Sequence, residues 1–326
     1  MVDFKEAPQV IRDFLSYMET IKGKAKNTMK EYYFDLRMFF RFIKQIKGLV
    51  NNSTSFDDII IDDITIEIIN TISLSDLYEF MSYVNHERNN NARSRARKVA
   101  CLKSFFKYLN SKAKLLDHNP AKELDSPKLP KSMPKYLTLD ESLLLLNAVD
   151  GEHKVRDYAI LTLFLNCGMR LSELVSINIS KIKNDTLTVV GKGNKERTIY
   201  LNNACINAIQ KYMDIRPKDA VKDRNALFLS ERKQRISNKT VQYIVKKYIQ
   251  QAGLDTEKYS THKLRHTAAT LMYKHGGVDI RSLQEILGHE KLATTEIYTH
   301  VDNQQLRKAI ESNPLANIHQ HSKREG

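Results

Sequence analysis

Four of the seven prolines in this chain fall in one short stretch, at positions 120, 127, 130 and 134. Each proline removes a backbone donor and keeps the preceding residue out of the helical region, so no helix can run through them. Lysines are interleaved with these prolines at 122, 128, 131 and 135. We therefore expect an extended linker over 113–135, between a first domain at 1–112 and a second at 136–326. In 326 residues, each domain is long enough to bury its own core.

Before the linker, apolar residues recur every three to four positions, which is the pattern of amphipathic helices. Capping-box pairs predict helix starts at Thr28 with Glu31 and at Ser73 with Asp76. A last helix is expected over about 92–110. Opposite its apolar face it carries Arg93, Arg95, Arg97, Lys98 and Lys103. A basic amphipathic helix is typical of a solvated surface, a membrane-surface helix or a nucleic-acid contact, and the pattern alone favours the solvated surface.

An acidic segment at 51–67 interrupts the first domain. It contains no basic residue and holds Asp57, Asp58, Asp62, Asp63 and Glu67. Phosphates would repel such a segment, so we expect it to face away from any bound nucleic acid.

After the linker, Thr138 with Glu141 predicts another helix start. The short runs Thr186–Val190 and Thr198–Leu201 flank a glycine-rich turn and predict a β-hairpin. From about Thr240 onward the helical pattern returns.

The net charge of +14 and the isoelectric point of about 9.4 indicate a polyanionic partner, either nucleic acid or an acidic membrane surface. The second part carries most of the excess: 34 Lys and Arg against 24 Asp and Glu, compared with 18 against 14 in residues 1–112. Phosphate binding by this excess would weaken steeply as salt rises.

No apolar run approaches the roughly 20 residues that span a bilayer, and the N-terminus lacks a signal pattern, so we expect a cytoplasmic protein. Cys101, Cys167 and Cys205 are widely spaced and form no C-x-x-C pair. They are typical of buried thiols in a reducing compartment, and not of a disulfide framework or a zinc site.

Two arginines are candidates for binding a phosphate, because a guanidinium donates paired hydrogen bonds and stays charged. Arg170 follows Cys167-Gly168, where a turn allows close approach, and Glu173 would lie on the same face of a following helix and orient it. Arg265 lies in a second motif, His262-Lys-Leu-Arg-His266. Taken singly, a surface ion pair or a cap is the commoner explanation for an arginine such as Arg170.

The His262 motif places His262, Arg265 and His266 on one side of a helix. A zinc site is disfavoured because residue 263 is Lys where a metalloprotease has Glu. His262 is therefore a candidate for proton transfer or phosphate binding, and His266 for bracing the helix. With no carboxylate cluster nearby, we expect neither a metal nor another cofactor.

Lys192 lies between Gly191 and Gly193 at the predicted hairpin tip, where a partly desolvated lysine can act as a general acid. An exposed turn lysine is the commoner structural explanation. Lys195 and Arg197 follow as candidate phosphate contacts.

His289 follows Gly288, and Tyr298 comes nine residues later as the candidate nucleophile. Most tyrosines on helices are packing residues, and this chain has 15, so the spacing from Leu287-Gly-His289 carries the choice.

The order and spacing of these motifs resemble the tyrosine recombinase family, and its Xer branch in particular. The likeness runs from about residue 7 to residue 301 and fills every position of the family's active set: Arg170, Glu173, Lys192, His262, Arg265, His289 and Tyr298. It implies a mainly α fold, with a helical, SAM-like core-binding domain before a mostly helical catalytic domain that has a small β-sheet. The acidic segment at 51–67 is longer than in the simplest Xer proteins.

The resemblance also implies a mechanism. Tyr298 would attack the scissile phosphate, form a 3′-phosphotyrosyl link and release a 5′-hydroxyl. Arg170, Arg265 and His289 would stabilise the transition state. Lys192 would protonate the leaving oxygen, and His262 would assist proton transfer. A 5′-hydroxyl from a partner strand would reverse the step without ATP or metal.

The implied partners are double-stranded DNA with a specific site and a homo- or hetero-tetramer of recombinases on two duplexes, joined through a Holliday junction. A C-terminal segment at about 303–318 would be exchanged between protomers. Arg93, Arg95, Arg97 and Lys98 become expected DNA contacts. The implied role is chromosome-dimer resolution in the bacterial nucleoid, with control by a translocase left open. The alternatives are an integrase or excisionase of a mobile element, a type IB topoisomerase-like enzyme, and an inactive DNA-binding regulator.

Overall fold

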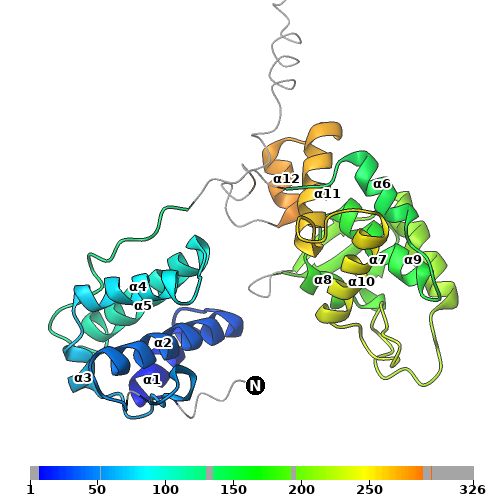
Figure 1. The fold of residues 1–326 in the computed structure, drawn as a ribbon. Coiled ribbons are helices and arrows are strands. Elements are labelled where there is room, and N and C mark those ends of the chain that lie inside the picture. Colours follow the sequence, from blue (N-terminus) through cyan, green and yellow to red (C-terminus); the bar gives the residue numbers. More distant parts are fainter. Residues whose placement is uncertain (1–6, 52, 130–134, 192–195, 289–294, 296–326) are drawn as a thin grey trace, which may run out of the picture. The chain divides into compact units, whose positions relative to one another are not determined.

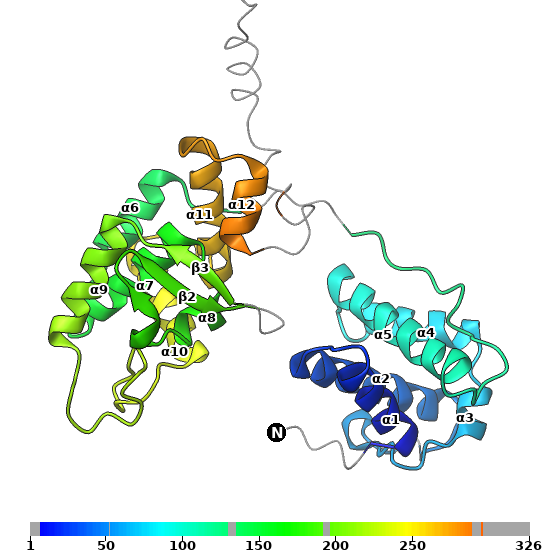
Figure 2. The same ribbon diagram turned by 180° about the vertical axis from the view of Figure 1, so that it is seen from behind.

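The computed structural model describes residues 7–51, 53–129, 135–191, 196–288 and 295. The described chain is mostly helical with a small antiparallel sheet, which confirms the expected mainly α class (Figures 1 and 2). It divides into two compact units, Met1–Lys131 and Ser132–Gly326. The expected exchange segment at 303–318 lies outside the described residues.

The first unit is a helical bundle around an aromatic core. Its elements are α1 (Gln9–Thr20), α2 (Lys26–Ile46), the 3₁₀ turn η2 (Phe56–Asp58), α3 (Ile66–Asn70), α4 (Leu74–His86) and α5 (Ala92–Ser111). Phenylalanines from α2, α4 and α5 meet edge to face, with the Phe39 and Phe80 ring centroids 5.1 Å apart. Such pairs add directional contacts to the burial of apolar area that holds the bundle together.

One of the two helix starts expected in this unit is confirmed. Ser73 and Asp76 form both bonds of a capping box at the start of α4. The prediction at Thr28 is wrong: α2 begins at Lys26, and its N-cap, Ala25, makes no side-chain capping bond.

The first part of the expected linker packs with the first unit. Leu116, Ala121 and Leu124 are buried in the core of that unit, although a linker was expected from residue 113. The preceding helix, α5, ends at Ser111, and Pro120 starts a turn that packs on the bundle.

The basic face expected on α5 is only partly open to solvent. Lys98 is buried, and its Nζ lies 2.8 Å from Oδ1 of buried Asp35 on α2. Arg97 Nη1 binds the other oxygen of Asp35 at 2.6 Å. This corrects the expected placement of Lys98, since its position four residues before Leu102 puts it on the apolar face. Arg93 is exposed, and Arg95 is half-buried with a bond to the Asn90 carbonyl.

We expect Lys98→Met to destabilise the first unit by roughly 1–3 kcal/mol, because it leaves a buried Asp35 oxygen without its partner. Hydrogen exchange of the α2 and α5 amides measures the loss. Lys107→Met on the exposed side of the same helix is the control and should change little. If hydrogen exchange is unchanged in the Lys98 variant but DNA binding is weaker, then Lys98 is a phosphate contact and not a structural partner of Asp35.

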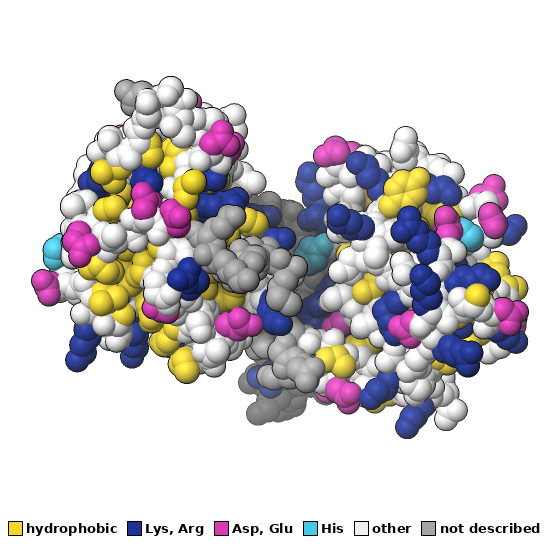
Figure 3. Space-filling view, turned by 90° about the horizontal axis from the view of Figure 1, so that it is seen from below, with side chains coloured by type: hydrophobic (Ala, Val, Ile, Leu, Met, Phe, Trp, Pro, Cys, Tyr) yellow, Lys and Arg dark blue, Asp and Glu magenta, His cyan; other side chains and the backbone are white. Residues whose placement is uncertain are grey.

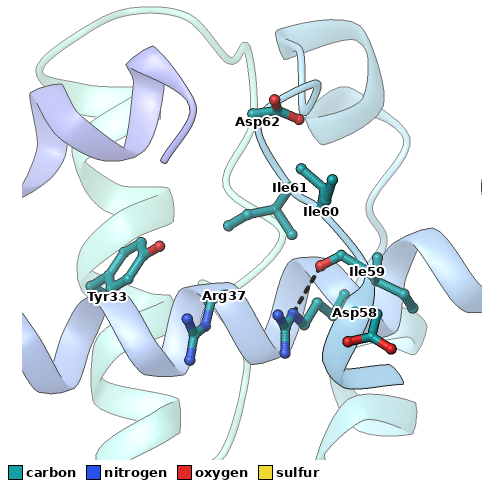
Figure 4. A pocket seen from close by; sticks show the side chains of 8 residues that line it. Tyr33, Arg37, Asp58, Ile59, Ile60, Ile61 and Asp62 are labelled. Atoms are coloured by element: carbon teal, nitrogen blue, oxygen red, sulfur yellow. Dashed lines mark hydrogen bonds between the residues drawn. The ribbon is translucent and has the colours of Figure 1, made fainter. Parts of the chain in front are cut away.

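The acidic segment is bound to α2 by its own carboxylates. Asp63 accepts a hydrogen bond from Lys44 at 2.7 Å, and Asp57 lies 3.3 Å from both Arg41 and Arg88. Figure 4 shows residues 58–62 passing beside α2 and lining a pocket with Tyr33 and Arg37. The segment therefore neutralises basic residues of its own unit.

The second unit builds a three-stranded sheet and helices around the buried helix α7. Its elements are α6 (Leu139–Asn147), α7 (Lys154–Cys167), α8 (Leu171–Val175), the 3₁₀ turn η3 (Ile179–Lys181), β1 (Ile182–Lys183), β2 (Thr186–Val190), β3 (Glu196–Tyr200), α9 (Asn203–Ile215), α10 (Asn238–Gln251), α11 (Thr261–His275) and α12 (Ile280–Leu287). Strands β2 and β3 pair antiparallel with Val190 opposite Glu196, which confirms the hairpin. The capping box of Thr138 and Glu141 at the start of α6 is also confirmed.

The three cysteines are buried free thiols, as expected. Sγ of Cys167, at the end of α7, lies 3.6 Å from Sγ of Cys205 on α9. Of the helices that the structure describes, none has the length and apolar character to cross a bilayer.

Candidate active site

The site begins at the sharp turn that ends α7. Gly168 has a φ of +57°, a conformation that glycine adopts at little cost. A Cβ at this position would lie 2.9 Å from Cδ2 of Leu287, so the turn also packs directly against the end of α12. Two residues later the chain enters α8, with Arg170 as its N-cap.

Arg170 is held from two sides. Its Nη1 donates to Oε1 of Glu173 at 2.8 Å, and its Nη2 donates to the Gly288 carbonyl at 2.8 Å. Its backbone N–H donates to Oε2 of Glu173 at 2.7 Å, so this carboxylate fixes both ends of the residue. About a third of the Arg170 side chain stays exposed, which leaves it open to a ligand.

Arg265, from α11, lies in the same cluster and is buried. Its Nη1 donates to the Gly168 carbonyl and its Nη2 to the Leu287 carbonyl, both at 2.6 Å. Nη1 also lies 4.0 Å from Oε2 of Glu173. The two arginines predicted from separate motifs therefore meet between the α7 turn and the end of α12.

Glu173 is fully buried and carries the negative charge of the cluster. Burial raises the pKa of its carboxyl, but hydrogen bonds and charge from Arg197, and then from Arg170, hold the pKa below its ordinary value. The carboxylate is therefore ionised at neutral pH and orients the guanidinium groups.

We expect Glu173→Gln to destabilise the second unit by roughly 1.5–3 kcal/mol at pH 7, because charged hydrogen bonds are lost and a Gln amide must face arginine donors. The ionised carboxylate stabilises the fold above its unfolded pKa of about 4.5, and this contribution is lost as pH falls through the lower folded pKa. Calorimetric unfolding should thus show a gap between wild type and variant that narrows below pH 4.5. A gap that is independent of pH would contradict the ion-pair role.

His262, in the first turn of α11, lines the same depression as Arg170 and Arg265. Desolvation, followed by the charges of Arg265, Lys263 and Arg170, lowers the pKa of its ring. The imidazole is therefore neutral at pH 7 and able to accept a proton. His266 packs edge to face against it, with ring centroids 4.6 Å apart, consistent with a bracing role.

A depression of about 470 Å³ lies in front of these groups. It is lined by Met169, Arg170, Leu171, Ser172, Asn238, Thr261, His262 and Arg265. The surface of this unit is rich in basic side chains, and Lys and Arg are spread across the face seen on the right of Figure 3. The chemistry of the lining, with two guanidinium groups and an imidazole, suits a phosphate.

The structure brings together four of the predicted active-site residues: Arg170, Glu173, His262 and Arg265. Lys192, Lys195, His289 and Tyr298 lie outside the described residues. Arg93, Arg95, Arg97 and Lys98 belong to the first unit.

The sequence interpretation missed the structural role of Arg197. It was expected as a phosphate contact, but its guanidinium binds Glu173 and the Ile286 carbonyl. Strand periodicity was the available signal, because Arg197 shares a face of β3 with buried Ile199.

Residues 135–305, which contain this cluster, match the sequence model of the phage integrase family. The chain belongs to this family. The resemblance to Xer-type tyrosine recombinases is confirmed as well. Tyrosine recombinase XerC of Caldanaerobacter subterraneus subsp. tengcongensis is 57% identical over 97% of this chain and 90% of its own length. Tyrosine recombinase XerC of Thermodesulfovibrio yellowstonii is 34% identical over 94% and 96%.

Solved structures share the fold. XerH site-specific recombinase bound to its difH substrate has a TM-score of 0.67 and 22% identity, covering 93% of this chain and 84% of that one. A fragment of the Tn1549 transposon integrase (amino acids 82–397) in complex with circular intermediate DNA has a TM-score of 0.66 and 19% identity, covering 94% of this chain and 100% of that fragment. Both a Xer protein and a mobile-element integrase are thus similar to this chain in fold.

Proposed function

We propose that this chain is a site-specific DNA recombinase that cuts and rejoins DNA through a 3′-phosphotyrosyl link and a Holliday junction. The observation that carries the proposal is the convergence of Arg170 and Arg265 on Glu173 and on the Leu287–Gly288 turn. Two fixed guanidinium groups beside an open depression can neutralise the non-bridging oxygens of a phosphodiester. The 57% identity to a XerC protein supports the same activity.

In the proposed reaction, the hydroxyl oxygen of Tyr298 attacks the scissile phosphorus and the bond to the 5′ oxygen breaks. Lys192 donates a proton to that leaving oxygen, giving a 5′-hydroxyl, and neutral His262 assists the transfer by accepting the proton that the Tyr298 hydroxyl loses. Arg170, Arg265 and His289 stabilise the charge of the transition state. The phosphotyrosine keeps the bond energy, so attack by a partner strand's 5′-hydroxyl rejoins DNA without an external energy source.

The proposed role is resolution of chromosome dimers in the bacterial nucleoid, by a tetramer of recombinases on two duplexes, with a translocase as the proposed regulator. Lambda integrase, which shares the fold at 17% identity and a TM-score of 0.65, has been solved as a tetramer bound to a Holliday junction. The full-length likeness to XerC proteins favours the chromosomal role over integration of a mobile element.

Covalent capture tests the proposal. The wild-type protein is incubated with sheared genomic DNA of its own host and denatured, and the attached DNA is sequenced. We expect one enriched site near the replication terminus. Enrichment at the boundary of a mobile element would identify an integrase, and adducts without sequence preference a topoisomerase-like enzyme. If the protein binds DNA but forms no adduct, even when a second host recombinase is added, the result would identify a non-catalytic regulator.

A further inference from the structure

Arg197 was expected to contact DNA, but its guanidinium is engaged in hydrogen bonds within the protein. It lies on β3 opposite Val189, and its side chain is 13% exposed. Its Nη2 donates to Oε2 of Glu173 at 2.9 Å, and its Nε donates to Oε1 at 3.4 Å. Its Nη1 donates to the Ile286 carbonyl. All three guanidinium nitrogens therefore have protein partners.

Together with Arg170 and Arg265, this residue completes a repeating arrangement at the end of α12. The consecutive carbonyls of Ile286, Leu287 and Gly288 are bound by Arg197, Arg265 and Arg170, respectively. The last carbonyls of a helix lack intrahelical donors and lie at its negative end, so cations are favoured there. Each arginine thus fixes one carbonyl of the segment that leads directly to His289.

The same three arginines surround one carboxylate. Glu173 lies 2.8 Å from Arg170, 2.9 Å from Arg197 and 4.0 Å from Arg265. Gly288 also packs against Arg197, since a Cβ there would lie 2.8 Å from Cδ of Arg197. Removing the Arg197 guanidinium would free the Ile286 carbonyl and leave Glu173 to bind the two remaining arginines more strongly.

We propose that Arg197 is a positioning residue for DNA cleavage, which ties β3 to Glu173 and to the end of α12 and so sets where Arg170 and Arg265 present their guanidinium groups. This inference rests on the proposed recombinase function. Through its bonds to Glu173 and the Ile286 carbonyl, this one side chain links β3 to the elements that carry the phosphate-binding arginines.

The test uses the full-length protein and a nicked duplex carrying the DNA site recovered by covalent capture. Single-turnover cleavage is measured at saturating protein, and DNA affinity is measured at several salt concentrations. We expect Arg197→Met to slow cleavage by about 10- to 100-fold, as a displacement of about 1 Å in a catalytic group can do. Its affinity and salt dependence should match wild type. Arg197→Lys should recover part of the rate, and Lys183→Met on the exposed side of β1 is the control.

A double-mutant cycle separates positioning from a general loss of structure. If Arg197 acts through Arg170, then Arg170→Ala should cost much less in the Arg197→Met background than in wild type. Additive losses would overturn the inference. So would a weaker affinity with a salt slope reduced by about one, which is the signature of a lost phosphate contact. If Arg197→Met does not fold, the same cycle is measured with Arg197→Lys.

The two proposals fail in different ways. A wild-type protein that binds DNA but never cuts overturns the proposed function, and the role of Arg197 with it. A wild-type protein that cuts, and an Arg197→Met variant that cuts equally fast, overturns only the role of Arg197.

Discussion

Tyr298→Phe is expected to bind DNA normally and to form no covalent adduct at all. The variant loses only the phenolic oxygen, which is the atom proposed to form the bond to phosphorus. Denaturing gels of a nicked substrate carrying the captured site measure the adduct, and gel shifts under native conditions measure binding. The amount of adduct should fall below the detection limit in Tyr298→Phe, while the wild-type protein forms it readily.

Tyr200→Phe is the matched control for this variant. Tyr200 ends β3 in the same unit, and its side chain is 77% exposed. It should form adducts at the wild-type rate. Adducts that persist in Tyr298→Phe would mean that another residue is the nucleophile, and peptide mapping of the DNA-linked fragment would identify it.

Arg170→Ala and Arg265→Ala are expected to bind DNA and to cleave roughly 10²–10³-fold more slowly, the usual loss for one charge-stabilising donor. Both guanidinium groups are held before substrate arrives, by Glu173, Gly168 and the end of α12. Little reorganisation is then needed in the transition state. Single-turnover cleavage of the nicked substrate measures the effect.

Burial makes Arg265 the harder of the two to interpret, since its side chain is only 4% exposed and its removal also affects folding. Arg265→Lys retains the charge but cannot bind the Gly168 and Leu287 carbonyls in the same way. It should fold and still cleave slowly. Arg224→Ala, at an exposed position of the same unit, is the control. Wild-type cleavage by either active-site variant would contradict the assignment of the arginine pair.

Local patterns in the sequence were sufficient where the relevant partner lies close along the chain. The capping boxes at Ser73 and Thr138 form within four residues, and the β2–β3 hairpin forms around one short turn. The pairing of Arg170 with Glu173 is also local, since it spans three residues. At Thr28 the same pattern failed, because α2 had already started at Lys26.

Charge was a poorer guide, because a basic residue looks the same in sequence whether it faces solvent or a buried carboxylate. Lys98 and Arg197 were both expected at a DNA surface. Their partners, Asp35 and Glu173, are 63 and 24 residues away, respectively. Periodicity pointed inward for both residues, and it was the better signal than side-chain type.

The sequence by itself determined the family, the mainly α class and the identity of the chemical groups, because motif order and local spacing are properties of the chain alone. Only the tertiary structure decided how these groups are held. The carbonyls of Ile286, Leu287 and Gly288 become a binding site for three arginines because α7, α8, α11, α12 and β3 pack together. A buried carboxylate then needs nearby cations, and packing places them there from positions that are distant in the sequence.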